Sequence, residues 1–367
     1  AGFEKPLWFK TEKIKSEDLT WTRTNAHLAV ADECKSVQND VGVIDISGSS
    51  KFMVSGKDAN KFLNFLSCNK LPQTIGAIGL TLFHGRSGGI MTEQSITKIN
   101  EDTYYLVGPI LSENRDLDWM KSHAKNFKVT IENQTETTSS LLITGPKSRE
   151  LLQKIMKDDL SNSSLPWLRS KKMLVDSAQV RVMRVSYAGE LGFELHMPNY
   201  QLLSIYQSLF RVGKEMGLRD FGGYAFNSLR MEKMYRAWGS EFTEEISGIE
   251  AGMERFIDIN REFIGSDNLK KRMKKDLDVV LVYLVFDDDI QSECYGNEAV
   301  FHGEDLIGLT TSGAYGFRIK KSLAFAYIKP AFANEGQTLK VLTTAGIRLC
   351  HIEISAAYDP ENEKLRA

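Results

Sequence analysis

Short alternating runs of apolar and polar residues, each closed by a glycine turn, dominate the first part of the chain. Residues 40–68 (DVGVIDISGSSKFMVSGKDANKFLNFLSC) predict strand, turn, strand, turn and helix. The segment KFMVSG alternates as a half-buried strand does, GKD is a turn, and ANKFLNFL has apolar residues at helical spacing. A compact strand–turn–helix unit is therefore expected here.

The same unit recurs further along the chain. A strand is expected at 103–109, a helix at 113–127 and a strand at 128–134, and then 139–156 repeats the strand, Gly-Pro turn and helix. The stretches FMVSGKDANKFLNFL and LLITGPKSRELLQKI match in pattern. Two related α+β layers would follow from an internal duplication, although stretches this short also match by chance.

The pattern changes twice in the second half. Residues 171–198 read as consecutive strands with turns, and amphipathic helices are expected at 200–217 and 223–235. From about 278 onward only short strands spaced by turns remain, which predicts a small β-barrel or roll. The basic run LKKRMKKDL just before it is either a solvated helix face or a contact for an anionic ligand tail.

Composition narrows the class of protein. The 367 residues are 42% hydrophobic and 26% charged, with a net charge of -2, which is ordinary for a soluble globular chain and does not favour nucleic-acid binding. No apolar run is long enough to span a membrane. The opening AGFEKPLWFK has no signal-peptide core and no initiator Met, so we expect a processed chain or part of a longer one.

Several common site chemistries have no motif in the sequence. The four cysteines are scattered, which predicts free thiols in a reducing compartment, and the six histidines show no metal-ligand spacing. No GxGxxG, GxxxxGK[ST] or GxSxG motif occurs, so neither a dinucleotide site, a nucleotide-phosphate loop nor a nucleophile elbow is expected. No metal is expected.

Three segments carry candidate chemistry. GRSGGIMTEQSITKI has a double-glycine turn followed by Glu93, SYAGELGFELHMP contains Tyr187, Glu190 and Glu194, and NSLRMEKMYRAWGSEFT is a predicted helix carrying Arg230. Glu194 lies between Phe193 and Leu195, inside a run that otherwise predicts a buried strand. A buried carboxylate costs several kcal/mol unless it accepts hydrogen bonds. A heterocycle with an amino group beside a ring N–H would supply two such bonds.

Together and in this order, the segments resemble the folate-binding aminomethyltransferase superfamily. That family includes the glycine-cleavage T-protein and the folate-binding regions of dimethylglycine and sarcosine dehydrogenases. VGVIDISGSSKFMVSGKDANKFL, ITGPKSRELLQ, IEAGMERFIDINREFIG, LTTSGAYGF and the closing YDPENEKLRA also follow the family order, and the opening AGFEKPLWF is similar to the segment that starts the folate half of the dehydrogenases. SYAGELGFELHMP and KMYRAWGSE are closer to the dehydrogenase forms.

The resemblance implies an α+β fold of three domains in a clover-leaf around a central folate pocket, with a C-terminal β-barrel. Residues 1–50 with 140–244 would form the first domain, 51–139 with 245–275 the second, and 276–367 the barrel.

The resemblance also implies site residues. Glu93 would face N5 and N10 of tetrahydrofolate as the catalytic acidic residue, where most relatives have Asp. Tyr187, Glu194 and Arg230 would bind folate, with Glu194 reading the pteridine. The sequence departs from the family at Leu80, where a Tyr is usual, and in the QSI that follows Glu93.

The implied function is transfer of a methyl or methylene group from a methylated amine, such as dimethylglycine, sarcosine or a glycine-like donor, to tetrahydrofolate. One alternative is demethylation of a cationic sulfonium or quaternary ammonium donor, for which Phe83, Tyr187 and Trp238 could form an aromatic cage, with Phe83 and Trp238 lining the substrate pocket. Another is a non-catalytic folate-binding module. No flavin fingerprint occurs, so a dehydrogenase role would need a separate flavoprotein. The cytoplasm or the mitochondrial matrix is the expected compartment.

Overall fold

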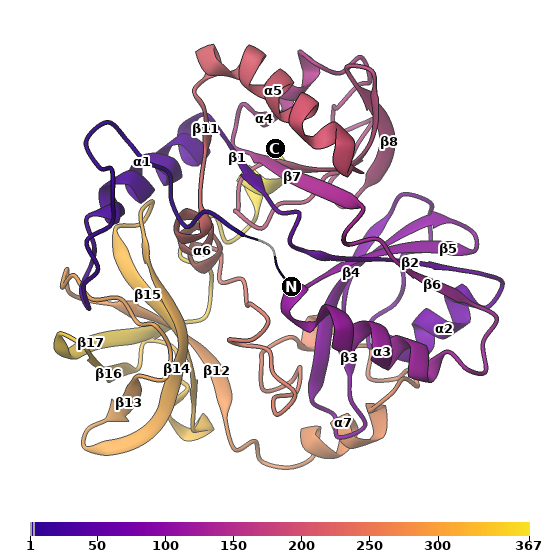
Figure 1. Cartoon of the computed structure of the whole chain (residues 1–367). Helices are drawn as coiled ribbons and strands as arrows, with labels where there is room; N and C mark the ends of the chain where they lie inside the picture. Colours follow the sequence, from indigo (N-terminus) through magenta and orange to yellow (C-terminus); the bar gives the residue numbers. More distant parts are fainter. Residues whose placement is uncertain (1, 3) are drawn as a thin grey trace.

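Three lobes, each with its own sheet, make up the molecule (Figure 1). The structure is a computed structural model and describes residue 2 and residues 4–367. Ala1 and Phe3, both in the opening AGFEKPLWF, lie outside the described residues. The expected three-lobed α+β fold with a C-terminal barrel is confirmed, whereas the domain bounds and the central folate pocket stay predictions.

The first lobe is a mixed six-stranded sheet with strand order β11-β1-β7-β10-β9-β8, in which β1 and β11 run parallel and the other pairs are antiparallel. Its strands are β1 (Val41–Asp45), β7 (Thr138–Thr144), β8 (Ser170–Val175), β9 (Ala178–Met183), β10 (Gly192–Pro198) and β11 (Leu218–Asp220). Its helices are α1 (Ala26–Asn39), α4 (Ser148–Gln153), α5 (Leu202–Gly213) and α6 (Gly223–Glu232).

Helices cover the two faces of this sheet unequally. Apolar side chains of α4 and α5 pack with Phe193 and Leu195 of β10 on one face, and those of α1 and α6 pack with Leu142 of β7 on the other. Where α1 and α6 end, the second face meets the second lobe through Met183 and Tyr105. Successive residues of a strand point to opposite faces, so Glu194 lies on the face that meets the second lobe.

The second lobe is an antiparallel sheet with order β3-β4-β5-β2-β6. Its strands are β2 (Ser50–Ser55), β3 (Ile78–His84), β4 (Ile90–Asn100), β5 (Thr103–Gly108) and β6 (Thr130–Asn133), and its helices are α2 (Ala59–Leu66) and α3 (Glu113–His123). Side chains of both helices pack with Phe52, Phe83 and Leu106 from one face of the sheet. The opposite face of this sheet points toward the centre of the molecule.

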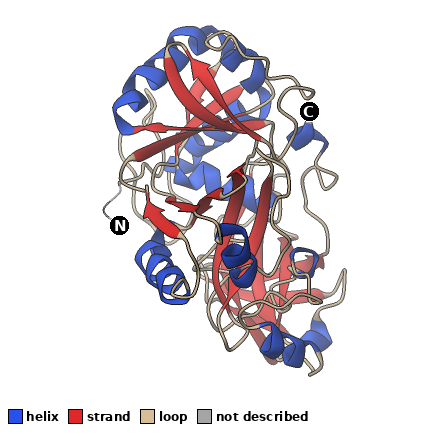
Figure 2. Ribbon diagram, turned by 90° about the vertical axis from the view of Figure 1, so that its right-hand side faces the viewer, coloured by secondary structure: helices blue, strands red, loops and turns tan. Residues whose placement is uncertain are grey.

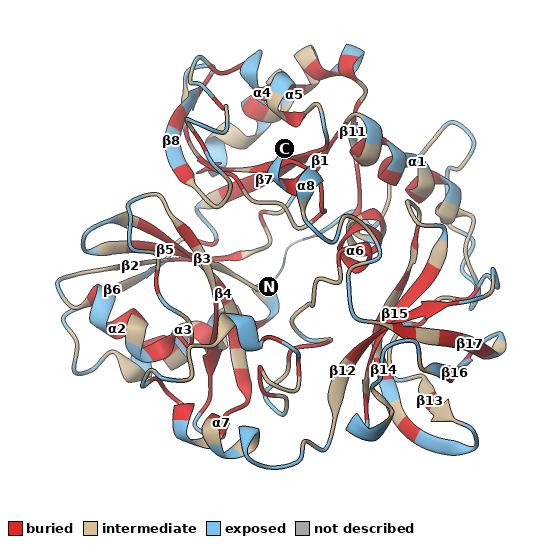
Figure 3. Ribbon diagram, turned by 180° about the vertical axis from the view of Figure 1, so that it is seen from behind, coloured by how far each residue is buried: buried red, intermediate tan, exposed pale blue. Residues whose placement is uncertain are grey.

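The third lobe is a closed barrel with strand order β12-β15-β14-β13-β16-β17. Its strands are β12 (Val280–Phe286), β13 (Ala299–His302), β14 (Asp305–Gly316), β15 (Lys321–Ile328), β16 (Thr338–Thr343) and β17 (Gly346–Glu353). Helix α7 (Ser266–Met273) precedes it and α8 (Glu363–Arg366) follows it. Buried residues gather along the strands of all three lobes (Figure 3), and helices wrap the outer side of the first sheet (Figure 2). No described helix is long and apolar enough to cross a bilayer.

Five short 3-10 helices join these elements: η1 (Ile110–Ser112), η2 (Asn199–Gln201), η3 (Lys214–Met216), η4 (Glu254–Phe256) and η5 (Pro330–Phe332).

The repeated strand–turn–helix unit expected from the sequence forms in both lobes, as β2–α2 and β7–α4. Each turn begins with a glycine at positive φ, Gly56 at 125° and Gly145 at 130°. A Cβ there would meet the backbone oxygen of Lys128 at 2.4 Å and that of Asp40 at 2.6 Å. Both turns therefore require glycine, for conformation and for close backbone approach. Common ancestry of the two units stays a prediction.

The helix predicted across NSLRMEKMYRAWGSEFT is shorter than expected. Helix α6 ends at Glu232, Met234 takes a positive φ of 58°, and residues 233–243 form an irregular segment. The guanidinium of Arg230 holds this segment back against the helix by donating to the Tyr235 carbonyl at 2.9 Å. Tertiary hydrogen bonding thus overrides a sequence that could continue as helix.

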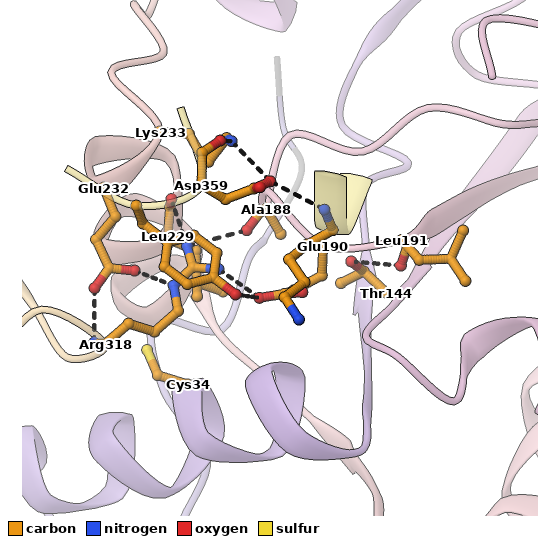
Figure 4. Close-up of polar contacts among 12 residues, drawn as sticks. Cys34, Thr144, Ala188, Glu190, Leu191, Leu229, Glu232, Lys233, Arg318 and Asp359 are labelled. Carbon is orange, nitrogen blue, oxygen red and sulfur yellow. Dashed lines mark hydrogen bonds and ion pairs between the residues drawn. The ribbon is translucent and has the colours of Figure 1, made fainter. Parts of the chain in front are cut away.

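A buried group of charges joins the barrel to the first lobe (Figure 4). Arg318, in the turn between β14 and β15, forms ion pairs with Glu190 at 2.8 Å and with Glu232. Its guanidinium also lies 3.8 Å from the ring centroid of Tyr358, whose hydroxyl donates to Glu190 at 2.7 Å. All three charged side chains are at most 3% exposed, so the barrel and the first lobe share one desolvated ion network.

We expect Arg318→Met to lower the free energy of unfolding by about 3–5 kcal/mol, because it leaves Glu190 and Glu232 buried without their cation. Chemical denaturation followed by circular dichroism measures the change. Lys340→Met is the matched control, since its pair with Glu304 spans 3.6 Å and Glu304 is fully exposed; its effect should stay below about 1 kcal/mol. Equal stability of Arg318→Met and the wild type would show that the network does not hold the lobes together.

Candidate functional site

Glu93 lies on β4, in register with Leu82 of β3, on the face of the sheet opposite α2 and α3. The preceding Gly-Gly turn packs on the segment after α6, where Ile90 N–H donates to the Ile246 carbonyl at 2.8 Å. A Cβ on Gly89 would lie 1.7 Å from the Glu244 carbonyl oxygen. The double glycine thus lets the hairpin that carries Glu93 dock closely.

The environment of Glu93 raises the pKa of its carboxyl. Its side chain keeps partial access to solvent, but the surrounding protein desolvates it and raises its pKa to about 7, against the opposing attraction of the Arg236 guanidinium. A carboxyl with a pKa near 7 can take up and release a proton at physiological pH.

Tyr187 brings the second and third candidate segments together. Its hydroxyl donates to the Arg236 carbonyl, and its ring stacks on Tyr235 at 5.4 Å between centroids. Burial raises the pKa of Tyr187, and the charges of Arg230 and Glu93 both act on it. Glu93, Tyr187 and Arg230 therefore converge where the first lobe, the second lobe and the barrel meet.

Arg230 is held by protein groups. Its guanidinium pairs with Glu241 at 3.0 Å and donates to Asn227 and to Ser312 of the barrel, each at 2.9 Å. The side chain is 5% exposed and that of Glu241 is fully buried. This arrangement matches the role of pairing with a neighbouring carboxylate to organise the core; contact of Arg230 with folate stays a prediction.

Glu194 occupies the face of β10 that meets the second lobe and is 15% exposed. Its carboxylate accepts a hydrogen bond from His196 Nε2 at 2.9 Å, and His196 Nδ1 lies 3.0 Å from the Tyr105 hydroxyl. Burial lowers the pKa of His196, so the ring is neutral and donates from Nε2 while Nδ1 accepts from Tyr105. His196 thus orients one oxygen of Glu194, and the other oxygen accepts no hydrogen bond from a described residue.

Glu190, in the same segment, has a different role from Glu194. It belongs to the buried Arg318 network and accepts from the Tyr358 hydroxyl. Burial raises the pKa of Glu190, and Arg318 opposes that shift. Of the two glutamates in SYAGELGFELHMP, Glu190 therefore joins lobes, whereas Glu194 faces the interior between two sheets.

The two residues expected to line a substrate pocket are not brought together. Phe83 is fully buried under α2 and α3 and stacks on Trp119 at 5.7 Å. It projects from the face of the sheet opposite Glu93, because Glu93 pairs in register with the adjacent residue Leu82. Trp238 is half-buried, and the Arg115 guanidinium lies 4.7 Å from its ring centroid.

The two departures from the family pattern have structural places. Leu80 packs partly buried in the same apolar cluster as Trp238. In the QSI segment, the buried amide of Gln94 donates to Thr92 at 3.2 Å, and Ile96 joins the core under α2 and α3.

Two residues that shape this region were not singled out from the sequence: Glu241, which satisfies Arg230, and His196, which orients Glu194. Arg236 was expected on the same helix as Arg230 without a role of its own, and it acts electrostatically on Glu93. Arg236 and Glu241 lie within the same quoted segment as Arg230, and His196 lies two residues after Glu194 on the same strand face. The two-residue period of a strand could have indicated His196. The irregular path of the chain after α6 could not be read from the sequence, and it hid the contacts of Arg236 and Glu241.

Metal binding and disulfide formation gain no support from the described residues. No group of three or more His, Cys, Asp and Glu among residues 2 and 4–367 is arranged to hold a metal ion. The prediction of free thiols is confirmed, since Cys34, Cys68, Cys294 and Cys350 are all free and buried. Hollows of about 540, 270 and 230 Å³ lie between elements, and none of these three is lined by Glu93, Tyr187 or Glu194.

Two family models together match most of the chain. The GCVT N-terminal domain matches residues 1–261, and the glycine cleavage T-protein C-terminal barrel domain matches residues 280–358. The second range contains all six barrel strands, from β12 to β17.

Curated relatives agree with these matches. Mitochondrial dimethylglycine dehydrogenase of Mus musculus is 35% identical over 347 residues, which are 93% of this chain but only 40% of that protein. The aminomethyltransferase of Caldanaerobacter subterraneus subsp. tengcongensis is 30% identical over 330 residues, 88% of this chain and 86% of that protein. The chain thus spans nearly a whole aminomethyltransferase and less than half of the dehydrogenase.

The fold agrees with a solved structure. The glycine cleavage system aminomethyltransferase T from Bartonella henselae superimposes with a TM-score of 0.83 over 94% of each chain, at 19% identity. Since the family models match well over half of the residues and the full-length aminomethyltransferase is 30% identical, this chain belongs to the glycine cleavage T-protein family.

Proposed function

We propose that this chain transfers a one-carbon unit from a methylated amine to tetrahydrofolate. The observation that carries the proposal is the Glu93 carboxyl, whose pKa of about 7 suits a general base, beside Tyr187 at the meeting point of the three lobes. Membership of a family with aminomethyltransferase relatives supports it. The donor would resemble dimethylglycine, sarcosine or glycine, in line with the name of the mouse relative.

The reaction needs a proton acceptor, and Glu93 is suited to that role. N5 of tetrahydrofolate attacks the methylene carbon of an iminium donor, and N10 then displaces the amine. The amine leaves with one of the two protons from N5 and N10, and the second proton is released. Glu93 in its ionised form accepts that second proton, while the site holds N5 and the donor carbon in line.

We assign binding of the pteridine end of tetrahydrofolate to Glu194. A pteridine has an amino group beside a ring N–H, and a carboxylate can accept a hydrogen bond from each of them. His196 engages one oxygen of Glu194 at 2.9 Å and fixes the plane of the carboxylate. Such an acceptor, already oriented before binding, loses less side-chain freedom when the ligand arrives.

Oxidation of the amine would need a flavin, which we assign to another chain or to a part of a longer protein. The match to only 40% of a dehydrogenase supports this division. Four free, buried thiols fit a reducing compartment, either the cytoplasm or the mitochondrial matrix. Small-molecule folate and amine are the proposed partners, with no nucleic acid.

Demethylation of a sulfonium or quaternary ammonium donor gains no support from the geometry. An aromatic cage needs several rings around one cavity. Here Phe83 is in a helix-covered core, Tyr187 stacks on Tyr235, and an Arg115 guanidinium already lies over Trp238.

Glu93→Gln should cut turnover by about 10²–10⁴ while changing folate affinity less than about tenfold, because it keeps the shape and removes the base. Steady-state assays with tetrahydrofolate and dimethylglycine-derived iminium or formaldehyde, following 5,10-methylene-tetrahydrofolate, measure the loss. Glu136→Gln, an exposed glutamate of the same lobe, is the control and should leave turnover unchanged. Full activity in Glu93→Gln would refute the catalytic assignment.

The pH profile tests the same group independently. The base works only when ionised, so kcat/KM should rise with pH along a limb centred on about 7, the pKa to which burial raises Glu93. The limb should disappear in Glu93→Gln. A limb that persists in the variant would belong to another group.

Glu194→Gln should weaken tetrahydrofolate binding by about 1–3 kcal/mol, the range for a hydrogen bond made to a charged group. The amide keeps one oxygen for His196 Nε2, so the fold around it is retained. Calorimetric titration with tetrahydrofolate measures the change. Wild-type binding that Glu194→Gln leaves unaltered would remove Glu194 from the ligand site.

A further inference from the structure

A hollow of about 540 Å³ lies between the first and second lobes, away from the proposed one-carbon site. Its walls come from the segment that leads into β3, the end of β4, the loop before β8, and strands β8 and β9. Its size falls within the range of small-molecule pockets. None of Glu93, Tyr187, Glu194 and Arg230 contributes to its lining.

The charge of this hollow is one-sided. No Asp or Glu lines it, whereas five basic residues do: Lys98, Arg169, Lys171, Lys172 and Arg181. Lys98 forms an ion pair with Glu101 at 2.8 Å. Lys172 and Arg181 are paired in register, so their side chains share one face of β8 and β9, whereas Lys171 points to the opposite face and acts on Asp159. Among the residues that the structure describes, Arg169, Lys172 and Arg181 have no carboxylate within ion-pair distance. These three like charges repel each other, and an anion would relieve that repulsion.

Arg181 shows the imbalance most clearly. It is half-buried, and burial lowers its pKa, since water is replaced by protein around the guanidinium. Its contacts are the Ser170 hydroxyl at 3.4 Å and the Tyr105 ring, 5.6 Å from the centroid. A guanidinium has five N–H donors and matches phosphate or carboxylate bidentately. Arg181 therefore carries more donor capacity and charge than the fold uses.

The floor of the hollow is rigid. Gly76 N–H donates to the Lys98 carbonyl at 2.8 Å, and Ser170 N–H donates to the Gly76 carbonyl at 2.7 Å. Gly76 has φ 80°, and a Cβ there would lie 2.6 Å from the Ser170 oxygen. Only glycine permits this backbone contact between the lobes. The cations project from paired backbone, so their positions are set before a ligand arrives.

The row of cations extends beyond this hollow. Lys172 and Arg181 also line an adjoining hollow of about 270 Å³, which Tyr105 and His196 border as well. Apolar walls accompany the charges in the larger hollow, among them Ile75, which is 58% exposed. A ligand with an anionic end and a less polar body would match both kinds of wall.

We propose that this hollow binds a small molecule that carries at least two negative charges, as phosphate or carboxylate groups. Arg181 grips the anion through its planar fork, and Lys172, in register with it on the edge strand β8, adds a point charge. None of Glu93, Tyr187, Glu194 and Arg230 lines the hollow, so the test does not depend on the activity of the chain.

Calorimetric titration of the full chain with inorganic pyrophosphate, and separately with citrate, tests the proposal at an ionic strength held constant with chloride. Saturable one-to-one binding is expected for at least one of the two anions, and the tighter one identifies phosphate or carboxylate as the group recognised. The double variant Lys172→Gln/Arg181→Gln, which removes two charges that lie in register on one face of β8 and β9, should weaken binding about tenfold or more.

The matched control is Lys274→Gln/Lys275→Gln, which removes the same charge from two exposed positions after α7 and should change affinity less than about twofold. Equal weakening by the two double variants, or no saturable binding of either anion, would overturn the proposal. A single-stranded oligonucleotide that binds more tightly than both anions and depends on Lys172 and Arg181 would overturn it in favour of a nucleic-acid surface.

Discussion

A desolvated arginine is the charge around which the barrel and the first lobe meet. Arg318 lies in the β14–β15 turn and forms ion pairs with Glu190 and Glu232, two carboxylates that are buried from solvent. Glu232 ends α6, and Glu190 precedes β10, the strand that carries Glu194. The ends of both candidate segments are therefore fixed by the same cation. Placement of the site depends on a charge balance rather than on apolar packing alone.

The carboxylates of the central region are distinguished by how many donors reach them. Glu241 accepts from Arg230, Ala237 N–H and the hydroxyls of Thr311 and Ser312, which leaves it no capacity for a ligand. Among the described residues, Glu194 has one hydrogen-bond donor, His196. Glu93 has a distant cation and a desolvated environment, so its proton affinity rises. The number of donors thus distinguishes Glu241, which organises the core, from the two carboxylates assigned to the proposed site.

Local patterns predicted the elements well because the strands are half-buried and alternate cleanly. β2, α2, β5, α3, β7 and α4 appeared where the apolar period placed them. The helix through Arg236 was overestimated, because the chain breaks at Met234 and the Arg230 guanidinium holds the following segment through the Tyr235 carbonyl, a contact that no apolar period reports. Helix α1 has no strong apolar stripe and was not anticipated.

The site was less predictable than the fold, because its residues come together only through contacts between lobes. The resemblance indicated Glu93 and Tyr187, whose convergence needs three lobes to meet, and no local period reports such contacts. The aromatic-cage alternative placed Phe83 near the same site, although one register step puts the side chains of Phe83 and Glu93 on opposite faces of a sheet. Which face a residue occupies depends on strand pairing, and pairing is a property of the folded chain.

The seams between the lobes have a mechanical consequence. The first and second lobes are joined by paired backbone, through Gly76 with Ser170 and Ile78 with Leu168. Sliding along that seam would break these hydrogen bonds together. The barrel is held by apolar packing around Met231 and by backbone hydrogen bonds that Tyr358 and Leu281 donate to Glu232 and Glu250, besides the buried ions. Neither seam offers a hinge, so the three lobes should move as one body.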